Sequence, residues 1–228
     1  MPVKTSDIDI QSFLNPTPES AYALGFLWGD GSFDGNSVRT EILASDALEV
    51  LPIFNAFGKW NAYSRLRPNR QLQTTINAEH MELNIFLKSH GYVSYRTTSP
   101  DSIIEFLPAE LRRFWFLGFF DADGCLYYNE KNGTSQCVFS GSYNQDWHFV
   151  EKMLRDLDTP YFKASKQNLA SGKSSRMRFC NKQNIYRFGK FIYAGHDLGL
   201  SRKRAKFKSM FENDPRYYDI GFLRTNLA

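Results

Sequence analysis

The sequence contains few cysteines, and their spacing suits neither a disulfide framework nor a zinc site. Only Cys125, Cys137 and Cys180 occur among the 228 residues. An odd number of cysteines without the paired spacing of metal ligands argues against both arrangements. We therefore expect reduced thiols and an intracellular protein. The sequence does not distinguish an organelle, a bacterial cytoplasm or a phage-infected cell.

Long hydrophobic runs are absent as well. The longest covers residues 114–120, well short of the ~20 residues that a membrane-spanning helix needs. Residues 1–7 are polar and lack the apolar core of a signal peptide. No glycine-rich phosphate loop and no nucleophile–histidine arrangement is visible. We expect no membrane partner, and a small-molecule enzyme has little support.

Acidic residues are nearly absent from one long segment. The formal net charge is +4, but residues 1–100 carry 8 Lys/Arg against 10 Asp/Glu, whereas residues 101–228 carry 20 against 14. Within residues 163–208 there are 13 basic residues and one acid, Asp197. Such a segment is typical of a protein that binds a polyphosphate. A solvated surface without a partner is the alternative on charge alone.

A short motif occurs twice in the chain. Residues 23–31 and 116–124 both read apolar, apolar, Gly, apolar, apolar, any residue, small, Asp, Gly. The two motif aspartates, Asp30 and Asp123, lie 93 positions apart. A repeat with this spacing predicts two similar structural units.

Each motif predicts a helix that ends at its Asp-Gly pair. Thr17 and Pro18 before the first copy are a cap and a first helical residue, and Gly31 and Gly124 stand where a helix stops. Small residues four apart share one helical face in each copy. These predicted interface residues are Gly25, Gly29, Gly118 and Ala122. They would let the two helices approach with their backbones nearly in contact.

The position of the two aspartates predicts a metal site. If the helices pack in parallel, Asp30 and Asp123 emerge together at the C-terminal ends, where the helix dipoles add further negative potential. A divalent cation would relieve this repulsion, and carboxylate oxygens suit Mg²⁺. The alternative for either motif alone is an ordinary buried helix followed by a turn.

Both motifs resemble the signature of the LAGLIDADG homing endonucleases. Residues 116–124 match it closely, whereas residues 23–31 depart at the sixth position, where Trp28 replaces an acid. In that family the eighth position carries the metal, and here it is Asp30 in the first copy and Asp123 in the second. The resemblance extends over about residues 15 to 212.

The resemblance implies a metal-dependent active site. It implies two or more Mg²⁺ ions between the helices, with Mn²⁺ or Ca²⁺ able to substitute. The implied ligands are the carboxylates of Asp30 and Asp123 and the backbone carbonyls of Gly29 and Ala122. It also implies a basic catalytic residue after the last strand of each half, for which Arg96 and Lys203 are the candidates, stabilising transition-state charge. Ordinary surface cations are the alternative for both.

The order of elements predicts an α+β fold made of two αββαββα halves, with antiparallel sheets that form a DNA-binding saddle as in that family. We expect domains at residues 1–96 and 108–228, joined by a linker at 97–107. Besides the motif helices, the predicted helices cover residues 46–57, 79–90, 144–157, 184–193 and 202–211. The helix at 46–57 would bury Leu48, Leu51, Phe54 and Phe57 on one side, with Pro52 in its first turn or breaking it. The apolar period of 144–157 predicts Phe149, Val150, Met153, Leu154 and Leu157 in the core. The predicted hairpins cover 32–44, 61–77, 125–140 and 160–181. Residues 1–16 read as a loose lead-in.

Polar residues alternate along the predicted strands and are candidate DNA contacts, because a two-stranded ribbon fits the major groove. Solvated strand residues are the alternative for each. Candidate guanine readers are Arg39, Arg65, Arg67, Arg70, Arg176 and Arg178, and candidate adenine readers are Gln71, Gln73 and Gln167. Thr75 lies on the same predicted face, and Lys163, Lys166 and Lys173 are candidate phosphate contacts.

Together these features predict a monomeric, metal-dependent endonuclease that cuts double-stranded DNA at a long asymmetric site, as intron homing requires. One alternative is an RNA-binding maturase that acts on intron RNA. Another is a DNA-binding protein of the same fold that has lost cleavage. The presence of both motif aspartates favours the nuclease.

Overall fold

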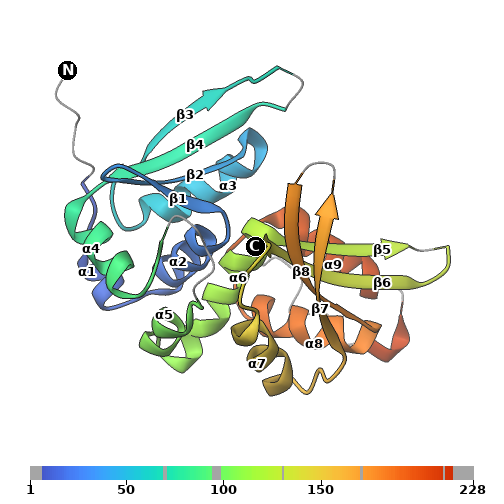
Figure 1. Ribbon diagram of the computed structural model, residues 1–228. Coiled ribbons are helices and arrows are strands. Elements are labelled where there is room, and N and C mark those ends of the chain that lie inside the picture. The colour runs from blue at the N-terminus through green and yellow to red at the C-terminus, as the bar shows by residue number, and fades with distance from the viewer. Residues whose placement is uncertain are drawn as a thin grey trace. The chain divides into compact units, whose positions relative to one another are not determined.

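The computed structural model describes residues 7–68, 71–93, 99–129, 131–169, 172–212 and 214–217. Their contacts divide the chain into two compact units, residues 1–122 and 123–228 (Figure 1). The segment expected as a linker, 97–107, contains helix α5 (Asp101–Phe106) of the first unit. No helix of the described residues is both long and apolar enough to cross a membrane.

The first unit holds one antiparallel sheet with strand order β1-β2-β4-β3. Its strands are β1 (Gly31–Asp34), β2 (Ser37–Leu43), β3 (Asn61–Arg65) and β4 (Gln73–Glu79). Its other helices are α1 (Gln11–Leu14), α2 (Pro18–Asp30), α3 (Ala44–Asn55), α4 (Met81–Ser89) and α6 (Arg112–Asp123), the last of which ends at the unit boundary.

The second unit repeats this plan with strand order β5-β6-β8-β7. Its strands are β5 (Gly124–Asn129), β6 (Thr134–Ser142), β7 (Phe162–Leu169) and β8 (Gly172–Cys180). Its helices are α7 (His148–Asp156), α8 (Lys182–Tyr193) and α9 (Ser201–Phe211). The predicted α+β class and the repeated order of hairpins and helices are confirmed, and α1, α5 and α9 are additions to the αββαββα repeat.

Each sheet buries one face beneath helices. In the first unit Val38 of β2 and Ile76 of β4 are fully buried, as is Phe54 of α3. In the second unit the rings of Phe139 and Phe179 pack on Phe188 of α8, with centroids 5.6 and 5.5 Å away. Alternation along each strand then directs the remaining side chains to the opposite face, which we call the open face of each sheet.

Local signals place the first motif helix and its hairpin. Thr17 caps α2 reciprocally with Ser20, and Pro18 is the first helical residue, as predicted. After α2, β1 and β2 are joined by a two-residue turn in which Gly35 has φ +61°, a conformation that favours glycine. The expected turn between these strands is therefore confirmed.

Three expectations about the first unit were wrong. Pro52 lies inside α3 instead of in its first turn, and Leu48, expected in the core, is 79% exposed. Residues 7–16 are no loose lead-in, because Phe13 of α1 is fully buried against Phe57, with ring centroids 4.7 Å apart. A four-residue helix leaves too short a pattern to recognise from its sequence.

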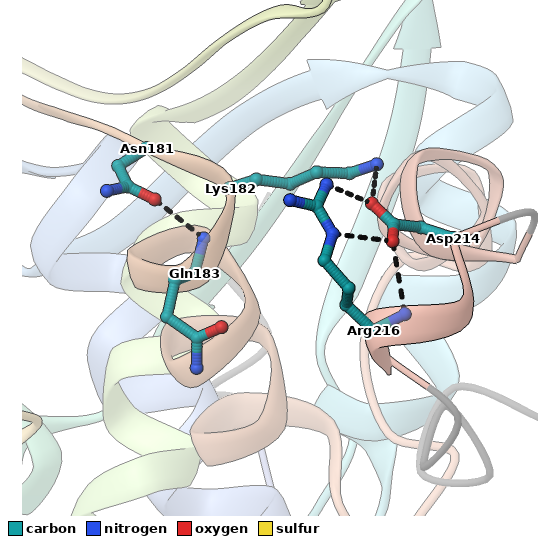
Figure 2. Close-up of polar contacts among 5 residues, drawn as sticks. All are labelled: Asn181, Lys182, Gln183, Asp214 and Arg216. Carbon is teal, nitrogen blue, oxygen red and sulfur yellow. Dashed lines mark hydrogen bonds and ion pairs between the residues drawn. The ribbon is translucent and has the colours of Figure 1, made fainter.

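The segment after α9 is held to the second unit by a cluster of charges (Figure 2). Asp214 accepts hydrogen bonds from the Lys182 ammonium at 2.9 Å and from the Arg216 guanidinium at 2.7 and 2.9 Å. These donors, Arg216 first, hold the pKa of the Asp214 carboxyl far below its usual range. Beside them the Tyr217 ring packs on Phe211, with centroids 5.0 Å apart.

Candidate active site and nucleic-acid interface

The two motif helices, α2 and α6, pack with their backbones in contact. A Cβ atom placed on Gly25 would lie 1.9 Å from the carbonyl oxygen of Trp115, and one on Gly118 would lie 2.0 Å from that of Tyr22. A Cβ atom on Gly29 would lie 2.4 Å from the existing Cβ of Ala122. The four small residues thus form the contact between the helices, and no larger side chain fits at the two inner glycines.

The sixth motif position is used differently by the two helices. Asp121 of α6 is 3% exposed, and its Oδ2 accepts a hydrogen bond from the Tyr22 hydroxyl of α2 at 3.0 Å. At the matching position of α2, Trp28 packs its ring on Tyr92 and Trp115, with centroids 5.1 and 6.4 Å away. The departure of the first motif therefore replaces a polar link by an aromatic one.

Asp30 is the last residue of α2 and is partly exposed. Its Oδ2 accepts a hydrogen bond from the Thr40 hydroxyl of β2 at 3.4 Å. One turn earlier, the Leu27 carbonyl accepts from both the Gly31 N–H and the Tyr92 hydroxyl, the latter at 3.0 Å. The end of α2 is thus fixed by β2 and by the segment that follows α4.

Asp123, partly exposed, ends α6, and Lys203 of α9 reaches the residue that follows it. The Lys203 side chain is mostly buried, and its ammonium donates a hydrogen bond to the Gly124 carbonyl at 2.7 Å. The neighbouring Arg204 is 3% exposed and donates to the carbonyls of His196 and Leu198 at 2.8 and 2.9 Å. Arg204 therefore anchors the start of α9, and this positions Lys203. The other predicted cation, Arg96, lies outside the described residues.

The donor set at the motif ends fits a hard divalent cation. Within the described residues, no group of three or more His, Cys, Asp and Glu side chains is arranged to hold a metal ion. The candidate ligands at each helix end are one motif carboxylate and the carbonyl of the residue before it, Gly29 in α2 and Ala122 in α6. Mg²⁺ suits such a sparse set, because it keeps several waters and binds through one or two carboxylates together with substrate phosphates.

The open face of the first sheet carries charges of both signs. Its arginines on the strands are Arg39 and Arg65, and its acids are Asp34, Glu41 and Glu79. Arg39 donates to Asp34 at 2.7 Å, and Arg67, just beyond β3, donates to Glu41 at 2.6 Å.

One predicted contact of this sheet, Thr75, is buried instead of exposed. Thr75 of β4 lies opposite Glu41 on one side and Tyr63 on the other, and it is only 6% exposed. Arg67, just beyond β3, reaches Glu41 of β2, so the two strands that flank β4 are linked by this pair. Gln71 is exposed and Gln73 is partly exposed, whereas Arg70 lies outside the described residues.

The charged residues on the open face of the second sheet are all cations. Lys163 pairs with Arg178 across the β7–β8 ladder, and Arg176 lies two residues before Arg178 on the same face. Gln167 pairs with Ser174 on this face. None of these three cations is within ion-pair distance of an acid among the described residues.

The other two predicted phosphate contacts lie on the opposite face of the hairpin. Lys166 pairs with Ser175 and Lys173 with Asn168, positions that alternate with the open face. Both ammonium groups lie over the Tyr143 ring, at 4.6 and 5.6 Å from its centroid. The phosphate contacts were predicted from charge without assigning the lysines to a face, and the acids Asp34 and Glu41 were not among the predicted contacts. The strict alternation of residues 37–43 could have placed Glu41 beside Arg39.

Comparison with known proteins identifies the fold. No family model matches the sequence, and no curated protein matches it. Solved structures do: the homing endonuclease I-WcaI bound to its DNA recognition sequence has a TM-score of 0.54 and 14% identity, with 87% of this chain and 91% of that chain covered. The LAGLIDADG homing endonuclease I-LtrWI bound to target DNA has a TM-score of 0.51 and 14% identity, covering 88% and 90%. WhiA (DUF199) from Thermatoga maritima has a TM-score of 0.50 and 15% identity, covering 91% and 66%.

Proposed function

The chain has the fold of the LAGLIDADG homing endonucleases, and from this premise we propose that it is a metal-dependent endonuclease that cuts double-stranded DNA at a long asymmetric site. Similar structures were solved on DNA targets, which supports DNA as the partner. The observation that carries the proposal is the pair of motif helices, whose backbones touch at Gly25 and Gly118 and which each end in an aspartate. Because one chain contains both helices, a monomer suffices.

Asp30 and Asp123 are the residues that would hold Mg²⁺, with the carbonyls of Gly29 and Ala122 as further ligands; Mn²⁺ or Ca²⁺ would substitute. Bound there, the ions would supply an activated water and relieve charge on the leaving oxygen. Thr40 orients the Asp30 carboxylate through its hydroxyl. Each aspartate would serve the cleavage of one DNA strand.

Lys203 would supply positive charge at the second site. Its ammonium is held on the Gly124 carbonyl, one residue after Asp123, in a mostly buried position. A cation fixed in a partly dehydrated site stabilises developing phosphate charge without reorganising during the reaction. Arg96 is proposed for the same role at the first site.

The test is cleavage of a plasmid library that carries randomised inserts, with Mg²⁺ against EDTA. The wild-type protein should produce linear DNA only with the metal. Asp30→Asn and Asp123→Asn should each abolish double-strand cleavage while leaving DNA binding in place. Double-strand cleavage retained by either variant would refute the roles of these aspartates.

A non-cleaving DNA-binding protein is the second candidate. It is favoured by one observation, that WhiA, a structure not described as an endonuclease, shares the fold over 91% of this chain. A maturase that binds intron RNA is a third candidate. Sequence-specific DNA binding without Mg²⁺-dependent cleavage would select the second candidate, and preference for a structured RNA over duplex DNA would select the third.

A further inference from the structure

The open faces of the two sheets carry very different charges, although the two units share one fold. On the open face, strands β5 to β8 carry three cations and no acid, whereas strands β1 to β4 carry two arginines and three acids. Acids on a surface that faces DNA repel its phosphates, and this lowers affinity for every sequence alike. Their presence on the first sheet therefore needs a reason other than affinity.

Two of these acids are held beside arginines in a fixed geometry. Arg39 Nη1 lies 2.7 Å from Asp34 Oδ2, and Arg67 Nη2 lies 2.6 Å from Glu41 Oε2. All four side chains stay partly exposed, from 32% for Glu41 to 63% for Asp34. Each pair thus presents guanidinium donors and a carboxylate acceptor next to each other on the open face.

This combination is complementary to a G·C base pair in the major groove. Guanine presents the acceptors N7 and O6, and cytosine presents its N4 amino donor. An arginine can satisfy the guanine, while the adjacent carboxylate accepts from the cytosine. An A·T pair has a donor, adenine N6, where guanine has O6, and an acceptor, thymine O4, where cytosine has its amino group. In the same register the guanidinium would therefore face a donor and the carboxylate an acceptor.

We infer that Asp34 and Glu41 are specificity-determining residues that, with Arg39 and Arg67, read G·C pairs and suppress binding to other sequences. The open face of the second sheet, with Lys163, Arg176 and Arg178, supplies the general affinity. This assignment of specificity to one sheet and affinity to the other rests on the proposed DNA binding, but it does not depend on cleavage. It follows the general rule that discrimination requires a penalty against wrong partners as well as contacts with the right one.

The first experiment measures binding of a fluorescent random-sequence duplex by anisotropy, with Ca²⁺ and low salt. Asp34→Asn and Glu41→Gln should each bind this duplex about 2- to 5-fold more tightly than the wild type, because each removes a charge that repels phosphates. Glu105→Gln of α5 and Asp156→Asn of α7 are matched controls on exposed helix positions, and they should change binding less.

The second experiment selects bound sequences from a randomised duplex library, again with Ca²⁺ so that binding alone is measured. Glu41→Gln should lose the preference for G·C at one position of the site, where discrimination should fall by about 5- to 150-fold. Asp34→Asn should do the same at a different position. The rest of the selected site should stay unchanged.

The outcomes separate this inference from the proposed nuclease. The inference would be overturned if both acid variants selected the same base preferences as the wild type. It would also be overturned if they bound random DNA no more tightly than the control variants. Either result would leave the proposed nuclease intact. Selected sites with the expected changes but no cleavage with Mg²⁺ would sustain the inference and refute the nuclease. Absence of DNA binding by the wild type would refute both.

Discussion

At the scale of single residues, the missing side chains of Gly25 and Gly118 determine how closely two helices approach. We expect Gly118→Ala to lower the free energy of unfolding by about 1–3 kcal/mol, because the new methyl group would meet the Tyr22 carbonyl at 2.0 Å and the helices must separate. Urea denaturation followed by circular dichroism measures this decrease.

Gly133→Ala is the control, since nothing lies within 4 Å of its Cβ position. Only its φ of +67° disfavours alanine, and this should lower the free energy of unfolding by about 1 kcal/mol. Equal decreases in both variants would contradict the close approach of the helices.

Lys203 offers a second test at this scale. We expect Lys203→Met to slow cleavage of one DNA strand by about 10²-fold, as removal of one preorganised donor commonly does. Nicked circles should then accumulate in a plasmid assay, because the strand served by Asp30 is still cut. Lys206→Met, an exposed position of the same helix, is the matched control and should leave the rates unchanged. Equal slowing of both strands would argue that Lys203 acts only on folding.

These residues show what a pattern can and cannot reveal. Small residues four apart indicated the interface positions directly, since a helix places them on one face. The hydrogen bond from Tyr22 to Asp121 could not be predicted, because the two residues meet only after the helices have packed. Lys203 was a candidate through the family resemblance, which implies a basic residue after the last strand of each half. Its hydrogen bond to Gly124 depends on how Arg204 anchors α9.

At the scale of elements, Asp214 ties the short segment after α9 to the start of α8. Its pKa is lowered in the folded state, so its contribution to stability is fully present above the ordinary aspartate pKa of about 4 and is lost as the pH falls toward the folded value. We therefore expect Asp214→Asn to lower the urea midpoint at pH 7. The difference from the wild type should shrink as the pH falls below about 4.

The control for this prediction is Asp156→Asn, at an exposed position of α7. Its effect on the urea midpoint at pH 7 should be small, since Asp156 has no ion pair among the described residues. A midpoint difference for Asp214→Asn that stays constant from neutral pH down to about pH 3 would contradict the role of the ionised carboxylate.

The elements that depend on interactions between neighbouring residues in the sequence were predicted best. The cap at Thr17, the turn at Gly35 and the period of α7 each depend on neighbours in the sequence. Burial was predicted less well, because it is decided by what packs on a helix from elsewhere. Leu48 fits the apolar stripe of α3 and is nevertheless exposed. Thr75 reads as a polar outward residue, yet it is buried between its ladder partners Glu41 and Tyr63.

At the scale of the whole molecule, the net charge of +4 is distributed unevenly between the two sheets. The uneven distribution along the sequence indicated a polyanion partner and placed it in the second half. What the sequence could not show is which cations share a face. Lys166 and Lys173 gather on Tyr143, on the face opposite to Arg176 and Arg178.

This division predicts where the salt dependence of DNA binding originates. Removing one cation that binds a phosphate should reduce the slope of log K against log salt concentration by about 0.9. The triple variant Lys163→Gln, Arg176→Gln and Arg178→Gln should therefore bind a random duplex with a slope smaller by up to about 2.7.

Lys152→Gln, Lys206→Gln and Lys208→Gln together form the matched control, since they remove the same charge from helix positions. Anisotropy titrations between about 50 and 200 mM KCl compare the two variants, and these concentrations span a range over which phosphate binding changes affinity by orders of magnitude. Because the control changes only the overall field, which salt screens over about 10 Å, its slope should shift by less than about one unit. Equal shifts in the two variants would mean that DNA responds to the net charge of the protein and not to the open face of the second sheet.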